Sequence, residues 1–66
     1  MFGLTKAEAK LAAILAKGQE LKSAAEELGI TYGTARSRLA QIFQKTATRR
    51  QGELVHLLFT YLLDGD

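Results

Sequence analysis

The chain contains no proline, and its apolar residues recur at helical spacing rather than in the alternating pattern of a half-buried strand. Residues that favour helix, chiefly alanine, leucine, glutamate and lysine, dominate the sequence, whereas β-branched residues are few. We therefore expect an all-α fold. A chain of 66 residues forms at most one domain with a small core, so its stability is marginal unless a partner covers part of its surface.

Two capping-box patterns, each a threonine followed three residues later by glutamate or glutamine, predict where the outer helices begin. Thr5 with Glu8 predicts the start of a first helix, which closes at the next glycine. Thr48 with Gln51 predicts the start of a fourth helix that spans about 49–63.

The segment 29–31, Gly-Ile-Thr, separates two further expected helices at about 21–28 and 32–46. Glycine ends the first of them, isoleucine points towards the core, and threonine caps the second. A short corner between two steeply crossing helices is what a helix-turn-helix unit needs, although corners in unrelated helical bundles share this spacing. The sequence therefore predicts a four-helix domain with a helix-turn-helix as one interpretation of its middle.

The basic charge of the chain is concentrated in one segment. Residues 28–52 contain five lysine or arginine residues and no acid, giving +5, whereas the remaining residues contain four bases and seven acids, giving −3. Such a segment indicates either an anionic partner or a solvated helix face that happens to be basic.

The third expected helix has one apolar side and one unusually bare side. Its apolar residues fall within an arc of about 100° that we expect to face the core: Ala35, Leu39, Ile42 and Phe43. The opposite side, which we call the bare strip, carries only small and amide side chains: Gly33, Ser37, Ala40, Gln41 and Gln44. Longer polar residues border the strip, with Arg36 on one flank and Thr34, Arg38 and Lys45 on the other.

Double-stranded DNA gives the bare strip a physical reason. The major groove admits one α-helix, and the helix backbone approaches the base edges only if the leading side chains are short, with arginines at the sides to reach phosphate or guanine. Ser37 then hydrogen-bonds to base edges, and Gln41 or Gln44 pairs with adenine. The alternative is that these glutamines are simply solvated.

The fourth expected helix is apolar over more of its surface than one core contact buries. Its apolar residues cover an arc of about 240°, whereas a helix that rests on a three-helix unit buries a stripe of about 100° or slightly more. We expect a two-fold homodimer through this helix, with docking on a further domain of a longer chain as the alternative. The expected core residues are Leu54, Leu57, Leu58 and Tyr61, and the expected dimer-interface residues are Val55, Phe59 and Leu62.

Several classes of function lack the residues they need. The chain has no cysteine and its single histidine, His56, has no companion ligand, so we expect no metal and no cofactor. No nucleophile, base and acid occur at a spacing typical of catalysis, so we do not expect an enzyme. The most apolar window, 54–63, is too short for a bilayer and the amino end does not look like a secretory signal, so we expect a cytoplasmic protein without a membrane partner.

Four stretches resemble the LuxR-type (GerE-like) helix-turn-helix domain of bacterial transcriptional regulators. They are LTKAEAKLAAILAKG, LKSAAEELGIT, TYGTARSRLAQIFQKT and RRQGELVHLL, and together they cover nearly the whole chain. The resemblance implies that residues 1–66 form one DNA-binding domain that dimerises through its last helix. In the family this domain is usually the carboxy-terminal effector part of a longer regulator, here with an amino-terminal sensor domain as the expected partner, and occasionally it is a free-standing protein.

The resemblance assigns roles to individual residues. It implies base-edge contacts from Arg36, Ser37 and Ala40. The helix geometry adds Gln41 to this set. It implies phosphate contacts from Lys22, Thr31, Thr34 and Lys45. The position of Arg38 on the flank of the bare strip adds Arg38 to this set. The chain departs from the family pattern at Glu20, Arg38, Ala40, Ala47 and Gln51. Ala40 restricts a base contact there to an apolar one, such as a thymine methyl, and a positive φ at Ala47 costs on the order of 1 kcal/mol.

Two other functions are alternatives. The fragment GTARSRL also resembles the DNA-binding fourth region of bacterial sigma factors, which act within a polymerase assembly and have less need of a symmetric dimer surface. The long apolar fourth helix argues against this alternative. The other is a protein-interaction module without DNA binding, in which the fourth helix carries the function and the basic helix is incidental.

Overall fold

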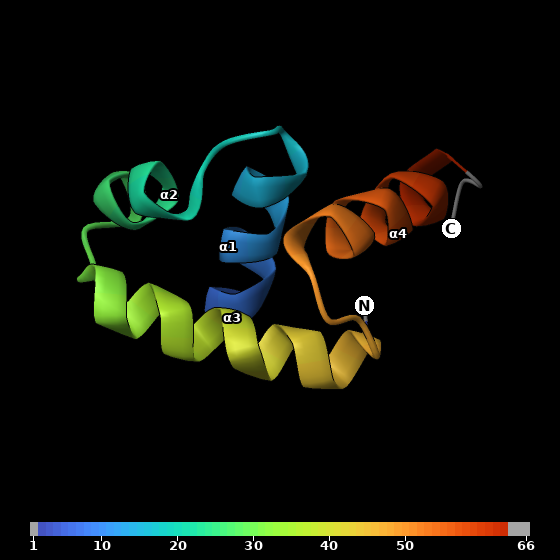
Figure 1. The fold of residues 1–66 in the computed structure, drawn as a ribbon, viewed down its shortest axis with the longest axis horizontal. Coiled ribbons are helices and arrows are strands. Elements are labelled where there is room, and N and C mark those ends of the chain that lie inside the picture. Colours follow the sequence, from blue (N-terminus) through green and yellow to red (C-terminus); the bar gives the residue numbers. More distant parts are fainter. Residues whose placement is uncertain (1, 64–66) are drawn as a thin grey trace.

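The computed structural model describes residues 2–63, with side chains up to residue 60, and within that range it contains four helices and no strand. The helices are α1 (Lys6–Ala16), α2 (Leu21–Leu28), α3 (Tyr32–Thr46) and α4 (Gln51–Leu63) (Figure 1). The predicted all-α, four-helix class is therefore confirmed. The second and third helices have the expected bounds, and α4 begins two residues later than expected.

The predicted start of α1 is confirmed in its hydrogen bonds. Thr5 Oγ1 accepts from the backbone N–H of Glu8 at 3.2 Å, and Glu8 Oε1 accepts from the backbone N–H of Thr5 at 2.9 Å. This reciprocal pair satisfies two backbone donors that the first turn of a helix leaves without a partner.

The predicted capping box at the start of α4 is wrong. The Thr48 hydroxyl lies 2.9 Å from the Thr46 hydroxyl, and Gln51 Nε2 donates to the backbone carbonyl of Gln19 at 3.2 Å. Glu53 makes the local contact instead, because its carboxylate accepts from the backbone N–H four residues earlier at 2.9 Å. The pattern fails because Gln51 finds a partner in the α1–α2 loop, which local spacing does not reveal.

The corner between α2 and α3 forms as expected. Gly29 adopts the left-handed conformation, with φ 70° and ψ 31°, and ends α2. Thr31 caps α3 by accepting from the backbone N–H of Thr34 at 3.1 Å. Ile30 is only half-buried, so it covers the edge of the core rather than filling it.

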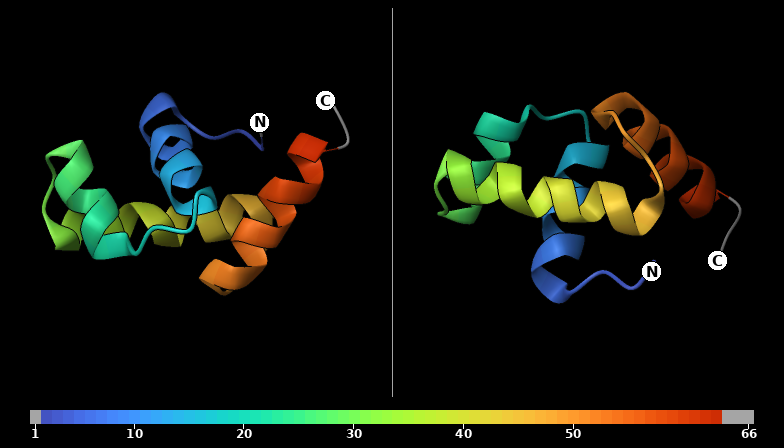
Figure 2. Two further views of the ribbon diagram at one scale, coloured as in Figure 1. Left: turned by 90° about the horizontal axis from the view of Figure 1, so that it is seen from above. Right: turned by 60° about the horizontal axis from the view of Figure 1, so that its bottom comes forward.

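The helices form two layers, with α3 along one side of the molecule and the other three helices on the other side (Figures 1 and 2). α1 contacts all three other helices, α2 also packs on α3, and α4 packs mainly against α1. α2 and α4 therefore lie towards opposite ends of α3, and the outer side of α3 is not covered by another helix of the described chain.

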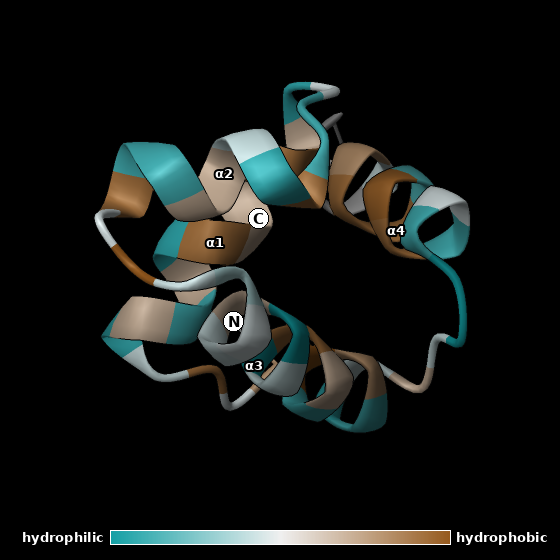
Figure 3. Ribbon diagram, turned by 60° about the vertical axis from the view of Figure 1, so that its left-hand side comes forward, coloured by the Kyte–Doolittle hydropathy of each residue, from teal (hydrophilic) through white to brown (hydrophobic). Residues whose placement is uncertain are grey.

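One apolar core lies between the layers, and Figure 3 shows the hydrophobic positions of α1, α3 and α4 turned towards it. Its largest fully buried side chains are Leu11, Leu15, Ile42, Leu54 and Leu58. The expected core face of α3 is confirmed: three of its residues are buried and the fourth, Phe43, is half-buried against the core. α2 contributes two buried alanines, which allow it to pack closely.

The expected core face of α4 is confirmed in part. Leu54 is fully buried and Leu58 is 2% exposed, whereas Leu57 is only half-buried. The side chain of Tyr61, also expected in the core, lies outside the described residues. The described part of α4 thus buries a narrow stripe against α1, as expected for a helix at the edge of a small domain.

Candidate nucleic-acid interface

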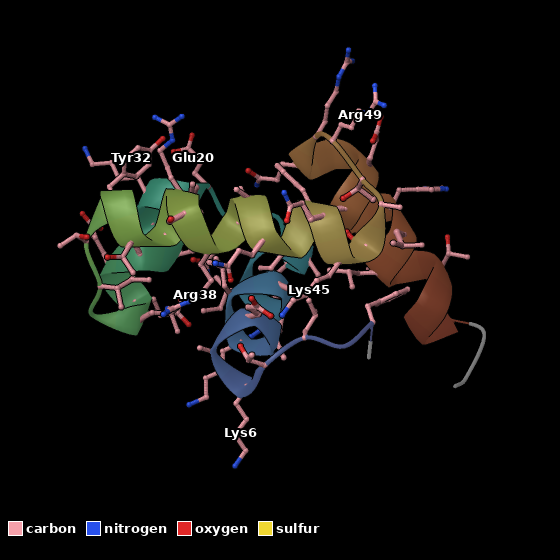
Figure 4. The ribbon with its side chains drawn as sticks, turned by 90° about the horizontal axis from the view of Figure 1, so that it is seen from below. Lys6, Glu20, Tyr32, Arg38, Lys45 and Arg49 are labelled. Atoms are coloured by element: carbon pink, nitrogen blue, oxygen red, sulfur yellow. The ribbon has the colours of Figure 1, made fainter. Side chains whose placement is uncertain are left out.

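The bare strip is exposed along the whole length of α3. Every one of its members is exposed, from Gly33 in the first turn to Gln44 in the last. In Figure 4, α3 lies nearest the viewer and the other helices lie behind it, so nothing in the described chain covers this strip. Ser37 and Gln41, which we expect at base edges, therefore point to solvent.

The amino end of α3 is organised by a pair of exposed threonines. Thr31 Oγ1 accepts from the Thr34 N–H and donates to Thr34 Oγ1 at 2.9 Å. The Thr34 hydroxyl therefore keeps its own proton for an outside acceptor such as a phosphate oxygen. The structure places both expected phosphate-contacting threonines together beside the strip.

The two flanks of the strip differ in their surroundings. Figure 4 shows Tyr32 on one flank, on the same side as Glu20, and Arg38 and Lys45 on the other. Arg36 is one helical turn after Tyr32 and therefore projects on the Tyr32 flank. Arg36 is exposed and Arg38 is half-buried, and neither makes an ion pair with a described residue.

Lys45 is held by an acid of α1. Its Nζ donates to Glu8 Oε1 at 2.7 Å, and the same oxygen accepts from the backbone N–H of Thr5. Glu8 is only 3% exposed, and the hydrogen bond from Lys45, followed by that from the Thr5 backbone, holds the pKa of the Glu8 carboxyl below its ordinary value of 4.5. The pair ties the end of α3 to the start of α1, so any phosphate that Lys45 contacts has to share this ammonium with Glu8.

The start of α2 lies beside the start of α4. The hydrogen bond from Gln51 to Gln19 joins the two, and Gln19 also bonds Ser23 and Glu27 of α2. Lys22, expected at phosphate, is exposed in the first turn of α2. It is unpaired within the described part of the chain.

Two further cations, Arg49 and Arg50, were not singled out by the sequence analysis. Both are exposed in the segment before α4, and Figure 4 shows Arg49 on the same side of α3 as Tyr32. Their only sequence signal was the lack of an acid between residues 28 and 52. Arg49 thus lies on the same side of α3 as Arg36, so the charge on this flank is larger than the helix wheel alone indicates.

The described part of α4 carries an apolar surface that α1 does not cover. Phe59 is 57% exposed and Val55 is half-buried, as expected for residues that face outward. Leu62, the third expected dimer residue, has a side chain outside the described residues. An exposed phenylalanine beside a half-buried valine is a surface that a partner can cover.

Among the described residues, no group of three histidine, cysteine, aspartate or glutamate side chains is placed to hold a metal ion. No described helix has the length and apolar character needed to cross a bilayer.

Comparison with known proteins finds no matching family model, no matching curated protein and no matching solved structure. The resemblance to the LuxR-type domain therefore stays an expectation, and the function has to be inferred from the geometry of α3 and α4.

Proposed function

We propose that this chain is a sequence-specific DNA-binding domain of a transcriptional regulator, which inserts α3 into the major groove and dimerises through α4. The observation that carries the proposal is the exposure of the bare strip along all of α3, with an arginine on either side. Exposed helix faces normally collect long charged residues, so a face limited to small and amide side chains needs a reason.

The dimensions of DNA supply that reason. A helix with its side chains is about 10–12 Å across and the major groove is about 12 Å wide, so one helix fits in the groove, and short leading side chains let its backbone come closer to the base edges. Gly33 and Ala40 then allow the backbone to approach the bases. Ser37 and Gln41 supply hydrogen-bonding groups at base edges, and Arg36 reaches guanine from the flank.

The charges are arranged to favour a polyanion. No acid occurs on α3 or in the segment that follows it up to α4. Glu8, which contacts the last turn of α3, is paired with Lys45. Lys22 and Arg49 add positive charge beside α3 without an ion pair in the described chain. A duplex that approaches α3 therefore meets cations on both flanks, and Glu20, on the Tyr32 flank, is the acid that these cations outnumber there.

The dimer is proposed from α4. Phe59 is the most exposed large apolar side chain of the described residues, and a two-fold contact through Phe59 and Val55 would remove it from water. Two copies of α3 spaced by about one turn of DNA would then read an inverted repeat. The same exposed phenylalanine favours the second candidate function, a protein-interaction module without DNA binding.

The test is salt-dependent binding to duplex DNA. Fragments retained by the purified domain are sequenced to identify a preferred site, and affinity for that site and for random DNA is then measured by fluorescence anisotropy from low to moderate salt. A dimer that neutralises about 8 phosphates has a slope of about −7 in a plot of log affinity against log salt concentration. The absence of a salt-sensitive complex with duplex DNA at low salt would refute the proposal and favour the interaction module.

Two variants separate base reading from phosphate binding. Arg36→Ala is expected to weaken the preferred site by about 1–3 kcal/mol and to reduce the preference over random DNA, whereas Lys22→Ala weakens both DNAs alike. Lys17→Ala, at the exposed end of α1, is the control and leaves both affinities unchanged. Equal losses on both DNAs for Arg36→Ala would exclude base reading by Arg36.

A third variant tests the dimer. Phe59→Glu places a charge in the proposed interface and is expected to give a folded monomer that binds the full inverted repeat poorly, as judged by analytical ultracentrifugation and circular dichroism. Sedimentation identical to that of the wild type would remove α4 from the dimer.

A further inference from the structure

A hollow on the Arg38 flank of α3 is lined by three cations and no acid. Its volume is about 310 Å³ and it lies where α1 passes the α2–α3 corner. The lining residues are Lys6, Ala7, Lys10, Leu28, Ile30 and Arg38. We propose that this hollow binds a phosphate group, and that the DNA backbone on this flank supplies it, so that the DNA interface extends from α3 onto α1. The choice of DNA as the source rests on the proposed function.

The first support is the pairing of the charges. The side chains of Lys6, Lys10 and Arg38 make no hydrogen bond or ion pair with any described residue. Glu8 is the single acid within α1, and its carboxylate is turned to Lys45 instead. The hollow therefore has three positive charges whose counter-charge has to come from outside.

The second support is the placement of the lysines on α1. Lys6 and Lys10 are one helical turn apart and share a face, and a like-charged pair at this spacing is mildly destabilising. Lys6 also lies in the first turn of α1, where the helix dipole disfavours a cation. A bound phosphate reverses both effects, because each lysine then faces a negative charge rather than another cation.

The third support is the arrangement around DNA. A helix that fills the major groove lies between two sugar-phosphate backbones, so each of its flanks faces one strand. On the flank of α3 that carries Arg38 and Lys45, Lys45 is already held by Glu8. The cations of the hollow therefore remain to contact the DNA strand that faces this flank. Figure 4 shows Lys6 extending from α1 on the same side of α3 as Arg38 and Lys45.

The hollow combines an apolar floor with basic side chains. Its apolar floor comes from Ala7, Leu28 and Ile30, all of which are half-buried. Long basic side chains lie along such a surface with their methylene groups and present their charged ends at the rim. A negative group at the rim is then contacted from α1 and α3 at once.

The experiment compares two lysines of α1. Lys10→Gln removes one charge from the hollow, and Lys17→Gln makes the same change at the exposed carboxy-terminal end of α1, which Figure 1 shows away from α3. Each lost phosphate contact changes the salt slope by about 0.9. Lys10→Gln is expected to lower the magnitude of the slope by about that amount for each bound subunit, and Lys17→Gln to leave it unchanged. Circular dichroism confirms that both variants are folded.

A second arm separates the two sources of phosphate. Inorganic phosphate is titrated into the DNA-free domain, and backbone amide shifts around residues 6–10 and 38 are followed by NMR. Saturable shifts in the wild type that are lost in Lys10→Gln support a phosphate site that also takes the free anion. Slopes for Lys10→Gln equal to those of the wild type would overturn the DNA contact and leave the role of α3 intact. No duplex binding by the wild type would instead reject the proposed function, and absent phosphate shifts would then overturn the hollow as well.

Discussion

Replacing Ala47 by glycine is expected to stabilise the domain, although it removes a side chain. Ala47 ends α3 in the left-handed conformation, with φ 57° and ψ 34°. The Thr48 N–H donates to the Phe43 carbonyl at 3.0 Å and the Ala47 N–H to the Gln44 carbonyl at 3.4 Å. These two bonds form a Schellman motif, in which the left-handed position normally holds glycine.

The magnitude follows from backbone sterics. The left-handed conformation costs a residue with a Cβ about 1–2 kcal/mol. Glycine avoids this cost but has a more flexible unfolded chain, which offsets about 0.4–1 kcal/mol of the gain. The alanine side chain is exposed, so its removal loses no packing. We expect Ala47→Gly to raise the free energy of unfolding by about 0.5–1 kcal/mol.

The reverse substitution, glycine to alanine, can be made at Gly29. That residue closes α2 with the same pattern, because the Ile30 N–H donates to the Ala25 carbonyl at 3.0 Å. A Cβ built at Gly29 meets nothing within 4 Å, so Gly29→Ala isolates the backbone cost and is expected to destabilise by about 1 kcal/mol. Ala13→Gly, at an exposed position inside α1, is the matched control and is expected to destabilise by about 0.5–1 kcal/mol.

Urea unfolding followed by far-UV circular dichroism measures all three variants at one protein concentration. For a domain of this size, 1 kcal/mol corresponds to a shift of about 4–8 °C in Tm, so thermal melts provide a second readout. If Ala47→Gly is no more stable than the wild type while Ala13→Gly loses stability as expected, the backbone argument is refuted.

Three further predictions test the fold. The pairing of Glu8 with Lys45 and with the Thr5 backbone N–H lowers the pKa of Glu8, so its contribution to the free energy of unfolding is present above pH 4.5 and is lost as the pH falls below that value towards the folded pKa. Glu8→Gln should lack this part of the pH dependence, and urea midpoints that fall in parallel for both proteins would contradict it. Glu20 precedes α2 as its N-cap residue but makes no side-chain cap hydrogen bond. Glu20→Ser is therefore expected to raise the free energy of unfolding by about 0.5–1 kcal/mol and to raise Tm accordingly, and an unchanged Tm would argue against a missing cap. Leu54 is fully buried, so Leu54→Ala should cost about 2–5 kcal/mol in urea unfolding, and a loss well below that range would mean that α4 is not packed in the core.

Sequence patterns were most reliable where a helix boundary depends on neighbouring residues. The Thr5–Glu8 box, the glycine at 29 and the threonine cap at 31 involve groups only a few residues apart, and all three are confirmed. The box expected at Thr48 has the same spacing but is wrong. Its glutamine bonds a carbonyl 32 residues earlier, and a competing partner at that distance does not show in local spacing.

The sequence by itself determined the four helices, the corner between α2 and α3, and the exposure of the bare strip. The period of the α-helix places residues on faces, and burial of the apolar face leaves the opposite face in water. Only the tertiary structure decided which cations remain free. Lys45 is held by Glu8 across 37 residues, and Lys6 and Lys10 come together with Arg38 because α1 packs beside the α2–α3 corner. These juxtapositions depend on how whole helices cross in a shared core, which no local sequence pattern specifies.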